Sequence, residues 1–268
     1  KAPSKMTSSN GISGFGGYGA QLAGIVYQSF ARLLRKQQAF ADAEPARRLR
    51  RELLVLGVVF VGVMLALVLT LDATAIGLMP SRGAPALWPV RILTDFGKDN
   101  YVLSLLAVLL VAIALIAPLW PETSRGRLFH FGARIQYIFF AVLVSVLCGQ
   151  LLKWIFSRGR PFVGGKADPF NFAPFSGTAA YSSLPSSHAV TAFALAFAVA
   201  AVWPQLRIPM YLYALAIALS RVVLLAHHPS DVVAGALIGL AGAMVVRYWF
   251  AERRLGFVAS EGGRIVPR

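Results

Sequence analysis

The amino-acid sequence predicts an all-α membrane protein, a bundle of six transmembrane helices. Hydrophobic residues make up 57% of the 268 residues and charged residues only 14%, a composition unlike that of a soluble domain. Several charge-free runs approach the length that a helix needs to cross the hydrocarbon core. Because these runs are too long and too uniformly apolar for barrel strands, helices are the expected structure.

Six apolar runs are the candidate spans. The first run, 53–71, covers the hydrocarbon core at a helical rise of about 1.5 Å per residue. The others follow at 101–120, 135–152, 189–206, 208–226 and 232–250. We therefore expect a cytoplasmic N-terminal segment over 1–52, a six-span domain over 53–250 and a cytoplasmic tail over 251–268.

The segment before the first span contains one pattern of its own. Residues 1–19 are rich in Ser and Gly, and we expect little order there. Between Leu22 and Leu34, apolar residues recur at helical spacing with arginines nearby. Such an amphipathic helix either lies along the inner leaflet or packs on the bundle, and the sequence leaves both open.

The distribution of basic residues predicts the orientation. With the N-terminus inside, the inner segments hold eighteen Lys and Arg and the outer segments hold eight. Both termini are then cytoplasmic, and the membrane is expected to be a bacterial inner membrane. The net charge of +15 could also suit a nucleic-acid binder, but the apolar runs exclude that class. The single cysteine, Cys148, excludes an intrachain disulfide and a cysteine cluster for zinc.

Two polar clusters occur at the outer ends of the third and fourth expected helices. Lys153 and Arg160 follow the third span, where flanking charges that reach into solvent are an ordinary explanation. Ser186, Ser187 and His188 precede the fourth span, where Ser is a normal helix cap. The same helix start is also an anion site, because its amides are free and its dipole end is positive.

A third cluster joins the fifth and sixth expected helices. Arg221 interrupts an apolar helix, where an unpaired guanidinium is costly and needs an anionic partner. His227 and Asp231 lie four residues apart around a proline turn, so we expect the carboxylate to accept the imidazole N–H and fix its tautomer. A satisfied interfacial histidine explains the pair equally well. With six spans, however, all three clusters lie on the same side of the membrane, opposite the cytoplasm. There they form a cationic site with two imidazoles, which suits phosphoryl transfer.

These residues resemble a known signature in three blocks. Lys153 with six residues before Arg160-Pro161, then Pro185-Ser186-Ser187-His188, then Ser220-Arg221 with His227 and Asp231, are similar to the type 2 phosphatidic acid phosphatase superfamily. Ser187 stands where the family usually has Gly. The resemblance implies a membrane phosphatase that hydrolyses the phosphomonoester or pyrophosphate of a lipid.

The resemblance also implies a role for each residue. His227 attacks phosphorus and forms a phosphohistidine, Asp231 orients His227, and His188 protonates the leaving oxygen. The oxygens are held by the phosphate-binding residues Lys153, Arg160, Ser186, Ser187 and Arg221. No metal or other cofactor is expected, because a single carboxylate is too few for a Mg²⁺ site.

The substrate is expected to be an amphiphilic phosphorylated lipid, because the reactive groups lie at headgroup level beside an aromatic-rich loop. The sequence does not distinguish between phosphatidate, a polyprenyl pyrophosphate and a phosphorylated glycolipid, and it leaves the oligomeric state open. Two alternatives remain: a phosphotransferase that passes the group to a second lipid or sugar, and a transporter that uses intramembrane charges. The family also contains vanadium-dependent peroxidases, but the apolar spans favour a membrane lipid substrate.

Overall fold

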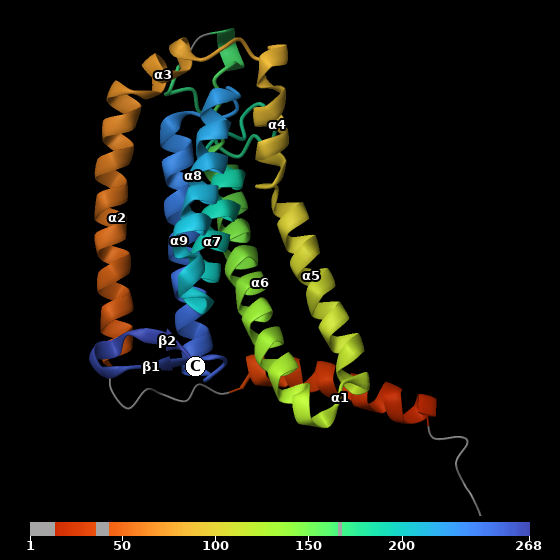
Figure 1. Ribbon diagram of the computed structural model, residues 1–268. Coiled ribbons are helices and arrows are strands. Elements are labelled where there is room, and N and C mark those ends of the chain that lie inside the picture. The colour runs from red at the N-terminus through yellow and green to blue at the C-terminus, as the bar shows by residue number, and fades with distance from the viewer. Residues whose placement is uncertain (1–13, 36–42, 166–167) are drawn as a thin grey trace, which may run out of the picture.

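The computed structural model describes residues 14–35, 43–165 and 168–268, and most of these residues are helical. The longer helices run roughly parallel as a bundle, with smaller elements at both ends (Figure 1). The elements are α1 (Gly14–Leu33), α2 (Glu44–Thr70), α3 (Asp72–Leu78), α4 (Trp88–Asp95), α5 (Asp99–Ile116), α6 (Glu122–Phe156), α7 (Ser187–Val202), α8 (Arg207–Val223), α9 (Pro229–Glu252), β1 (Phe257–Ala259) and β2 (Ile265–Pro267).

Every apolar run that the sequence predicted to be a span coincides for most of its length with a helix of the bundle. Five helical segments, which contain α2, α5, α6, α8 and α9, are long and apolar enough to cross a membrane. The remaining one, α7, is apolar but only 16 residues long. An α-helical membrane bundle is therefore confirmed. The predicted number of six spans is not confirmed, because five helices are long enough to cross a membrane and α7 is shorter.

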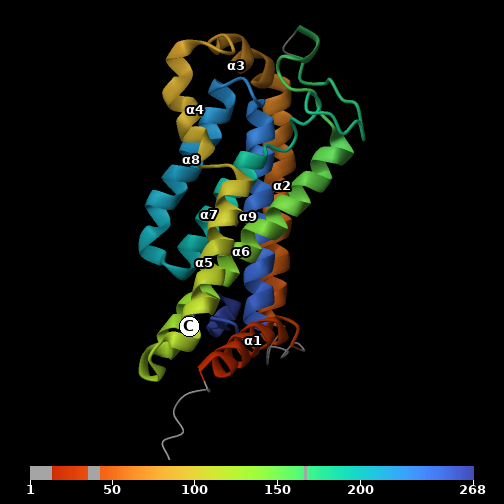
Figure 2. The same ribbon diagram turned by 90° about the vertical axis from the view of Figure 1, so that its right-hand side faces the viewer.

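The centre of the bundle is built from small residues. Helix α7 lies between α6, α8 and α9 (Figure 2), and its buried face consists largely of alanines. A Cβ added to Gly239 of α9 would lie 2.5 Å from the carbonyl oxygen of Val190, so the two backbones almost touch. Close approach over small residues is how helices gain contact in lipid, where no hydrophobic force drives them together.

The outer surface of the bundle carries the larger apolar side chains. Val58, Leu65 and Leu69 of α2 are exposed, as are Leu105 and Val108 of α5. Such a surface would be unstable in water and suits contact with lipid chains.

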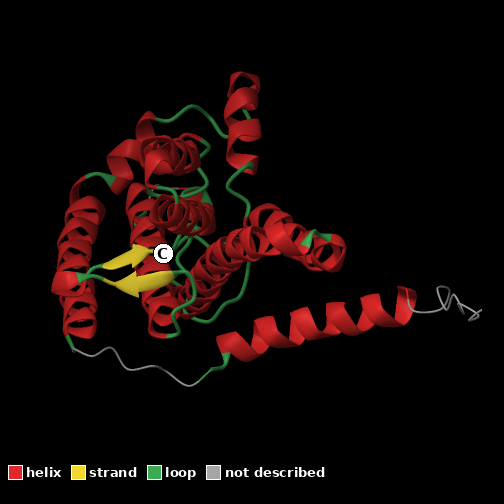
Figure 3. Cartoon of the chain, turned by 60° about the horizontal axis from the view of Figure 1, so that its bottom comes forward, coloured by secondary structure: helices red, strands yellow, loops and turns green. Residues whose placement is uncertain are grey.

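The two ends of the bundle differ. Helix α1 and the antiparallel pair β1–β2 lie at one end, and α3, the start of α4 and the long loop between α6 and α7 lie at the other (Figures 1 and 3). Residues 14–19, which we expected to lack order, belong to α1; residues 1–13 lie outside the described residues. The tail 251–268 contains the hairpin, and α2 begins nine residues before the expected start of the first span.

Candidate active site

The three polar clusters lie at the end of the bundle opposite α1 and the hairpin. Lys153 is in the last turn of α6, His188 is in the first turn of α7, and Arg221 is in the last turn of α8. His227 lies between α8 and α9, and Asp231 is in the first turn of α9. The topology therefore brings together helix ends that are far apart in the sequence, as the sequence predicted.

Direct hydrogen bonds join the clusters. The Ser186 amide donates to the backbone carbonyl of Asp231 at 3.0 Å, which ties the start of α7 to the start of α9. Lys153 Nζ donates to Ser187 Oγ at 2.7 Å, which ties α6 to α7. The hydroxymethyl group of Ser187, where the family usually has Gly, therefore holds the ammonium group of Lys153.

His227 is almost fully buried, and its tautomer is defined by its neighbour. Its Nδ1 lies 2.7 Å from the carbonyl oxygen of Ser183. A carbonyl only accepts, so Nδ1 carries the hydrogen and the Nε2 lone pair remains available to attack phosphorus. Burial, and then the positive charge of Lys153, lowers the pKa of His227 well below its ordinary value of 6.5, which keeps the imidazole neutral.

The expected contact between Asp231 and His227 is wrong. Within residues 14–35, 43–165 and 168–268, no hydrogen bond joins the two side chains. The carboxylate instead accepts from Ser183 Oγ at 2.5 Å, and from the amide and Nδ1 of His228 at 2.8 and 3.1 Å. The physical reason is that Pro229 begins α9, so Asp231 occupies the position that turns back to cap the helix at His228. Ser183 links the two residues, because its hydroxyl binds Asp231 and its carbonyl binds His227.

His228 was not among the residues predicted for the site, and it is fully buried within this network. Its imidazole and its backbone amide both bind Asp231, so its role is to fix the carboxylate. The sequence does contain a signal for this role, because a residue that directly precedes a proline at a helix start is a candidate N-cap.

A buried arginine was also missed. Arg158 is 1% exposed and lies between two fully buried carboxylates, with Nη1 2.6 Å from Asp231 and Nη2 2.8 Å from Asp72 of α3. Arg158 Nη1 also donates to Ser230 Oγ at 2.7 Å, and Asp72 in turn accepts from the amide and hydroxyl of Ser230. This network fixes Asp231 and connects α3 to the start of α9.

The groups expected to bind phosphate contain unused donors. Among the described residues, Arg160 Nε, Ser186 Oγ, His188 Nε2 and Arg221 Nε are buried without a hydrogen-bond partner. Buried polar atoms are normally paired, so a cluster of four unpaired ones fits a ligand with several acceptor oxygens. Arg221 is held in place by Thr94 of α4, whose hydroxyl lies 2.8 Å from Arg221 Nη1.

Arginines of the α3–α4 connection and of α4 extend the site, which no pattern in the sequence predicted. A cavity of about 390 Å³ is lined by Arg160 and Arg221 together with Arg82 and Arg91. Burial, and then the nearby Arg82, lowers the pKa of Arg160. The one carboxylate in the lining, Asp95, is already paired with Lys98 at 2.9 Å. The cavity is therefore strongly cationic.

Together the fold and the site define the class of the protein, a membrane-embedded enzyme for phosphoryl transfer. The sequence matches the PAP2 superfamily over residues 135–255. It is 30% identical over 212 residues to a lipid A 1-phosphatase of Rhizobium johnstonii, with 75% of this chain and 87% of the relative aligned. The chain belongs to the PAP2 superfamily.

The chain is also similar to one further curated protein and to one solved structure. A putative undecaprenyl-diphosphatase, YbjG of Escherichia coli, is 28% identical over 176 residues, which covers 65% of this chain and 80% of the relative. The crystal structure of a transmembrane PAP2 type phosphatidylglycerolphosphate phosphatase from Bacillus subtilis aligns with a TM-score of 0.47 at 20% identity, over 77% of this chain and 95% of that chain. The predicted family and the predicted activity of a lipid phosphate phosphatase are confirmed.

Proposed function

We propose that this protein hydrolyses a lipid phosphate through a phosphohistidine, with His227 as nucleophile and His188 as general acid and base. The observation that carries this proposal is the hydrogen bond from His227 Nδ1 to the Ser183 carbonyl, because it leaves Nε2 unprotonated at the end of the bundle where Arg160, Ser186 and Arg221 have unpaired donors. A phosphoryl group held by those donors presents its phosphorus to Nε2.

The reaction then proceeds in two balanced steps. His227 Nε2 bonds to phosphorus as the bond to the leaving oxygen breaks, and protonated His188 gives its proton to that oxygen. Neutral His188 next takes a proton from water, whose oxygen bonds to phosphorus as the phosphorus–nitrogen bond breaks. Lys153, Arg160, Ser186, the Ser187 amide and Arg221 stabilise charge on the oxygens in both steps. Asp231 positions His227 through Ser183.

The substrate carries a second phosphate bonded to the one that is cleaved. The cavity between Arg160 and Arg221 continues to Arg82 and Arg91, so the positive charge extends well beyond what one phosphate needs. In the proposed complex the second phosphate lies in this cavity with Arg82 and Arg91, and the terminal phosphate lies between Arg160, Arg221 and His227, which is not part of the cavity wall. The name of the relative YbjG, a putative undecaprenyl-diphosphatase, supports the same class of substrate.

The membrane topology follows from the same site. Six spans, with α7 as the short one, put both termini at the end opposite the histidines, which agrees with the location of α1 and the hairpin. The excess of basic residues at that end makes it the cytoplasmic end. The site then faces the periplasm or the exterior from the inner membrane of a bacterium.

The test is release of inorganic phosphate in detergent from a panel of lipid phosphates, without an added acceptor. Wild type is expected to release phosphate and His227→Ala to release none above background. His130→Ala, which removes an exposed histidine at the other end of α6, is the matched control and keeps full activity. Phosphate release only after addition of a lipid or sugar acceptor would identify a phosphotransferase instead. Function that persists in His227→Ala would favour the transporter.

Specificity is tested with a polyprenyl diphosphate and its monophosphate. In the double variant Arg82→Gln/Arg91→Gln, kcat/KM for the diphosphate is expected to fall about tenfold, because charge-assisted contacts to the second phosphate are lost. For the monophosphate, the same variant stays within about threefold of wild type. Equal losses on both substrates would show that these arginines only support the loop, as stacking of Arg82 on Phe162 at 3.8 Å would allow.

A further inference from the structure

Helix α1 is attached to the bundle near both of its ends. Near its start, the Tyr18 hydroxyl donates to the carbonyl of Leu115, at the end of α5, at 2.8 Å. At its last residue, the carbonyl of Leu33 accepts from Arg253 Nε at 3.0 Å, and the Leu33 side chain is buried. Between these two contacts, α1 crosses the inner ends of α5 and α6 (Figures 1 and 2).

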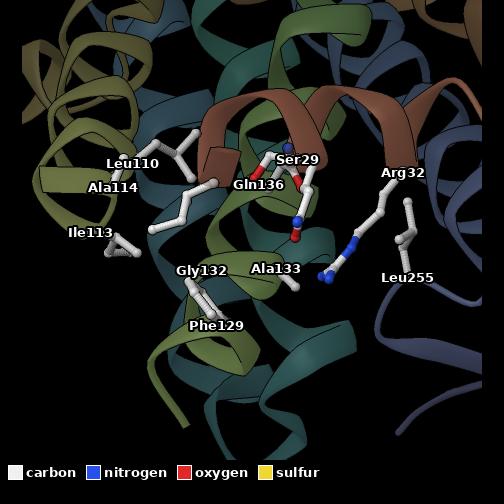
Figure 4. Close-up of a pocket in the computed structure, with 12 residues that line it drawn as sticks. Ser29, Arg32, Leu110, Ile113, Ala114, Phe129, Gly132, Ala133, Gln136 and Leu255 are labelled. Atoms are coloured by element: carbon white, nitrogen blue, oxygen red, sulfur yellow. The ribbon is translucent and has the colours of Figure 1, made fainter. Parts of the chain in front are cut away.

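The space beneath α1 is not filled by protein. A cavity of about 120 Å³ lies between α1, α5 and α6 (Figure 4). Its walls are mainly apolar, with Ile25 on α1, Leu110 and Ile113 on α5, and Ala133 on α6. Such a cavity suits hydrocarbon more than water.

A second cavity, of about 420 Å³, opens beside the first and is lined almost entirely by arginines. They are Arg32 in the last turn of α1, Arg35 just after α1, Arg253 and Arg254 directly after α9, and Arg268. Arg253 also binds two backbone carbonyls and lies 3.7 Å from Glu252, so it has a structural task. The other guanidinium groups concentrate positive charge in one place, at a cost that an anion would offset.

The two cavities are connected through shared walls. Arg32 and Leu255 line both of them. In Figure 4 the Arg32 side chain extends from α1 beside the apolar cavity, with Leu255 next to it. The combined shape is apolar at one end and strongly cationic at the other, which matches an amphiphile with an anionic headgroup.

We propose that these cavities bind one anionic phospholipid, whose phosphate lies among the arginines and whose first chain carbons lie beneath α1. Planar guanidinium groups suit phosphate oxygens, and basic pockets at the inner end of membrane helices bind anionic headgroups. A zwitterionic phospholipid has the same phosphate but also carries a cation that the arginines repel. The lipid fixes α1 to α5, α6 and α9, and it belongs to the leaflet opposite the histidines. This site is independent of the proposed catalytic reaction.

The experiment is thermal unfolding of the purified full chain in detergent, with phosphatidylglycerol, with phosphatidylcholine of the same acyl chains, and with inorganic phosphate. Wild type is expected to gain about 4 °C or more with phosphatidylglycerol and under about 1 °C with the other two. The double variant Arg32→Gln/Arg254→Gln and the cavity-filling variant Ala133→Leu each lose at least half of that gain. Arg127→Gln/Arg264→Gln, which removes two exposed charges outside both cavities, keeps all of it.

Each contrary result overturns a defined part of the inference. An equal rise in unfolding temperature with phosphatidylcholine would show that the site does not require an anionic headgroup, and an equal rise with inorganic phosphate would show that it does not require a lipid. A full rise in Arg32→Gln/Arg254→Gln would show that the arginine cavity does not bind the lipid, and a full rise in Ala133→Leu would show the same for the apolar cavity. Phosphate release is measured in parallel and is expected to be unchanged in both variants, because their residues lie at the end opposite the histidines.

Discussion

Replacement of Arg158 by Met tests the buried network that holds Asp231. The guanidinium of Arg158 donates to Asp231, Ser230, Asp72 and the carbonyl of Pro169. Methionine has a similar length but no charge, so the substitution leaves two buried carboxylates without their shared cation. We expect a substantial loss of stability and a loss of activity, because Asp231 then repels Asp72.

The size of the expected loss of stability depends on the hydrogen bonds that each carboxylate retains in the variant. Breaking a buried ion pair by removing one partner costs about 3–5 kcal/mol. Asp231 retains the Ser183 hydroxyl and the His228 amide, and Asp72 retains the Ser230 amide, so we expect the lower part of this range. A loss of about 3 kcal/mol in a chain of this size lowers Tm by roughly 10 °C.

The assay is thermal unfolding in detergent followed by tryptophan fluorescence, with phosphate release measured well below Tm. Adding Asp72→Asn to Arg158→Met removes one unpaired charge and is expected to restore part of the lost Tm, which a simple packing defect would not allow. Arg127→Met, at an exposed position on α6, is the control and stays within about 2 °C of wild type. A Tm for Arg158→Met within about 2 °C of wild type would refute the reasoning.

Three further predictions concern catalysis. The pH profile of kcat/KM is expected to be bell-shaped, because His227 must be neutral to attack and His188 must be protonated to act as the acid. The pKa of His227 is lowered, so activity is expected to rise with pH well below 6.5, and an acid limb at or above 6.5 contradicts this assignment. Activity is expected to survive EDTA, and complete loss that Mg²⁺ restores would reject a metal-independent reaction. Ser187→Gly frees Lys153 from the hydroxyl that holds it, so KM is expected to rise about threefold, whereas an unchanged or lower KM would show that the hydroxyl has no orienting role.

The main helices and the three clusters could be predicted because their signals are local. Charge-free runs define the helices, and spacing within each block defines the chemistry. Counting the spans between the three clusters then predicts that they lie on the same side of the membrane. The detail that failed is the partner of Asp231, since spacing alone cannot show that Pro229 at the start of α9 directs the carboxylate back to His228.

The sequence did not assign three residues to the site: Asp72, Arg82 and Arg91. The site residues that they meet in the fold, such as Arg158, Arg160 and Arg221, are distant from them in the chain. Arg158 binds Asp72 across 86 positions, and no periodic pattern connects them. A weak signal did exist at Asp72, which directly follows an apolar run at a depth where a charge is costly. The hairpin at the end of the chain has strands of three residues, too short for an alternating pattern to stand out.

The near contact between α7 and α9 has a consequence for the histidines. A Cβ at Gly235 would lie 2.5 Å from the carbonyl oxygen of Ser186, and Gly239 meets the backbone of α7 one turn deeper. His188 is the second residue of α7, and His227 lies two residues before the start of α9. The absence of a side chain at Gly235 and Gly239 therefore sets the distance between the proposed acid, His188, and the proposed nucleophile, His227. Any larger side chain at these positions would push α7 away from α9 and separate the two histidines without touching either.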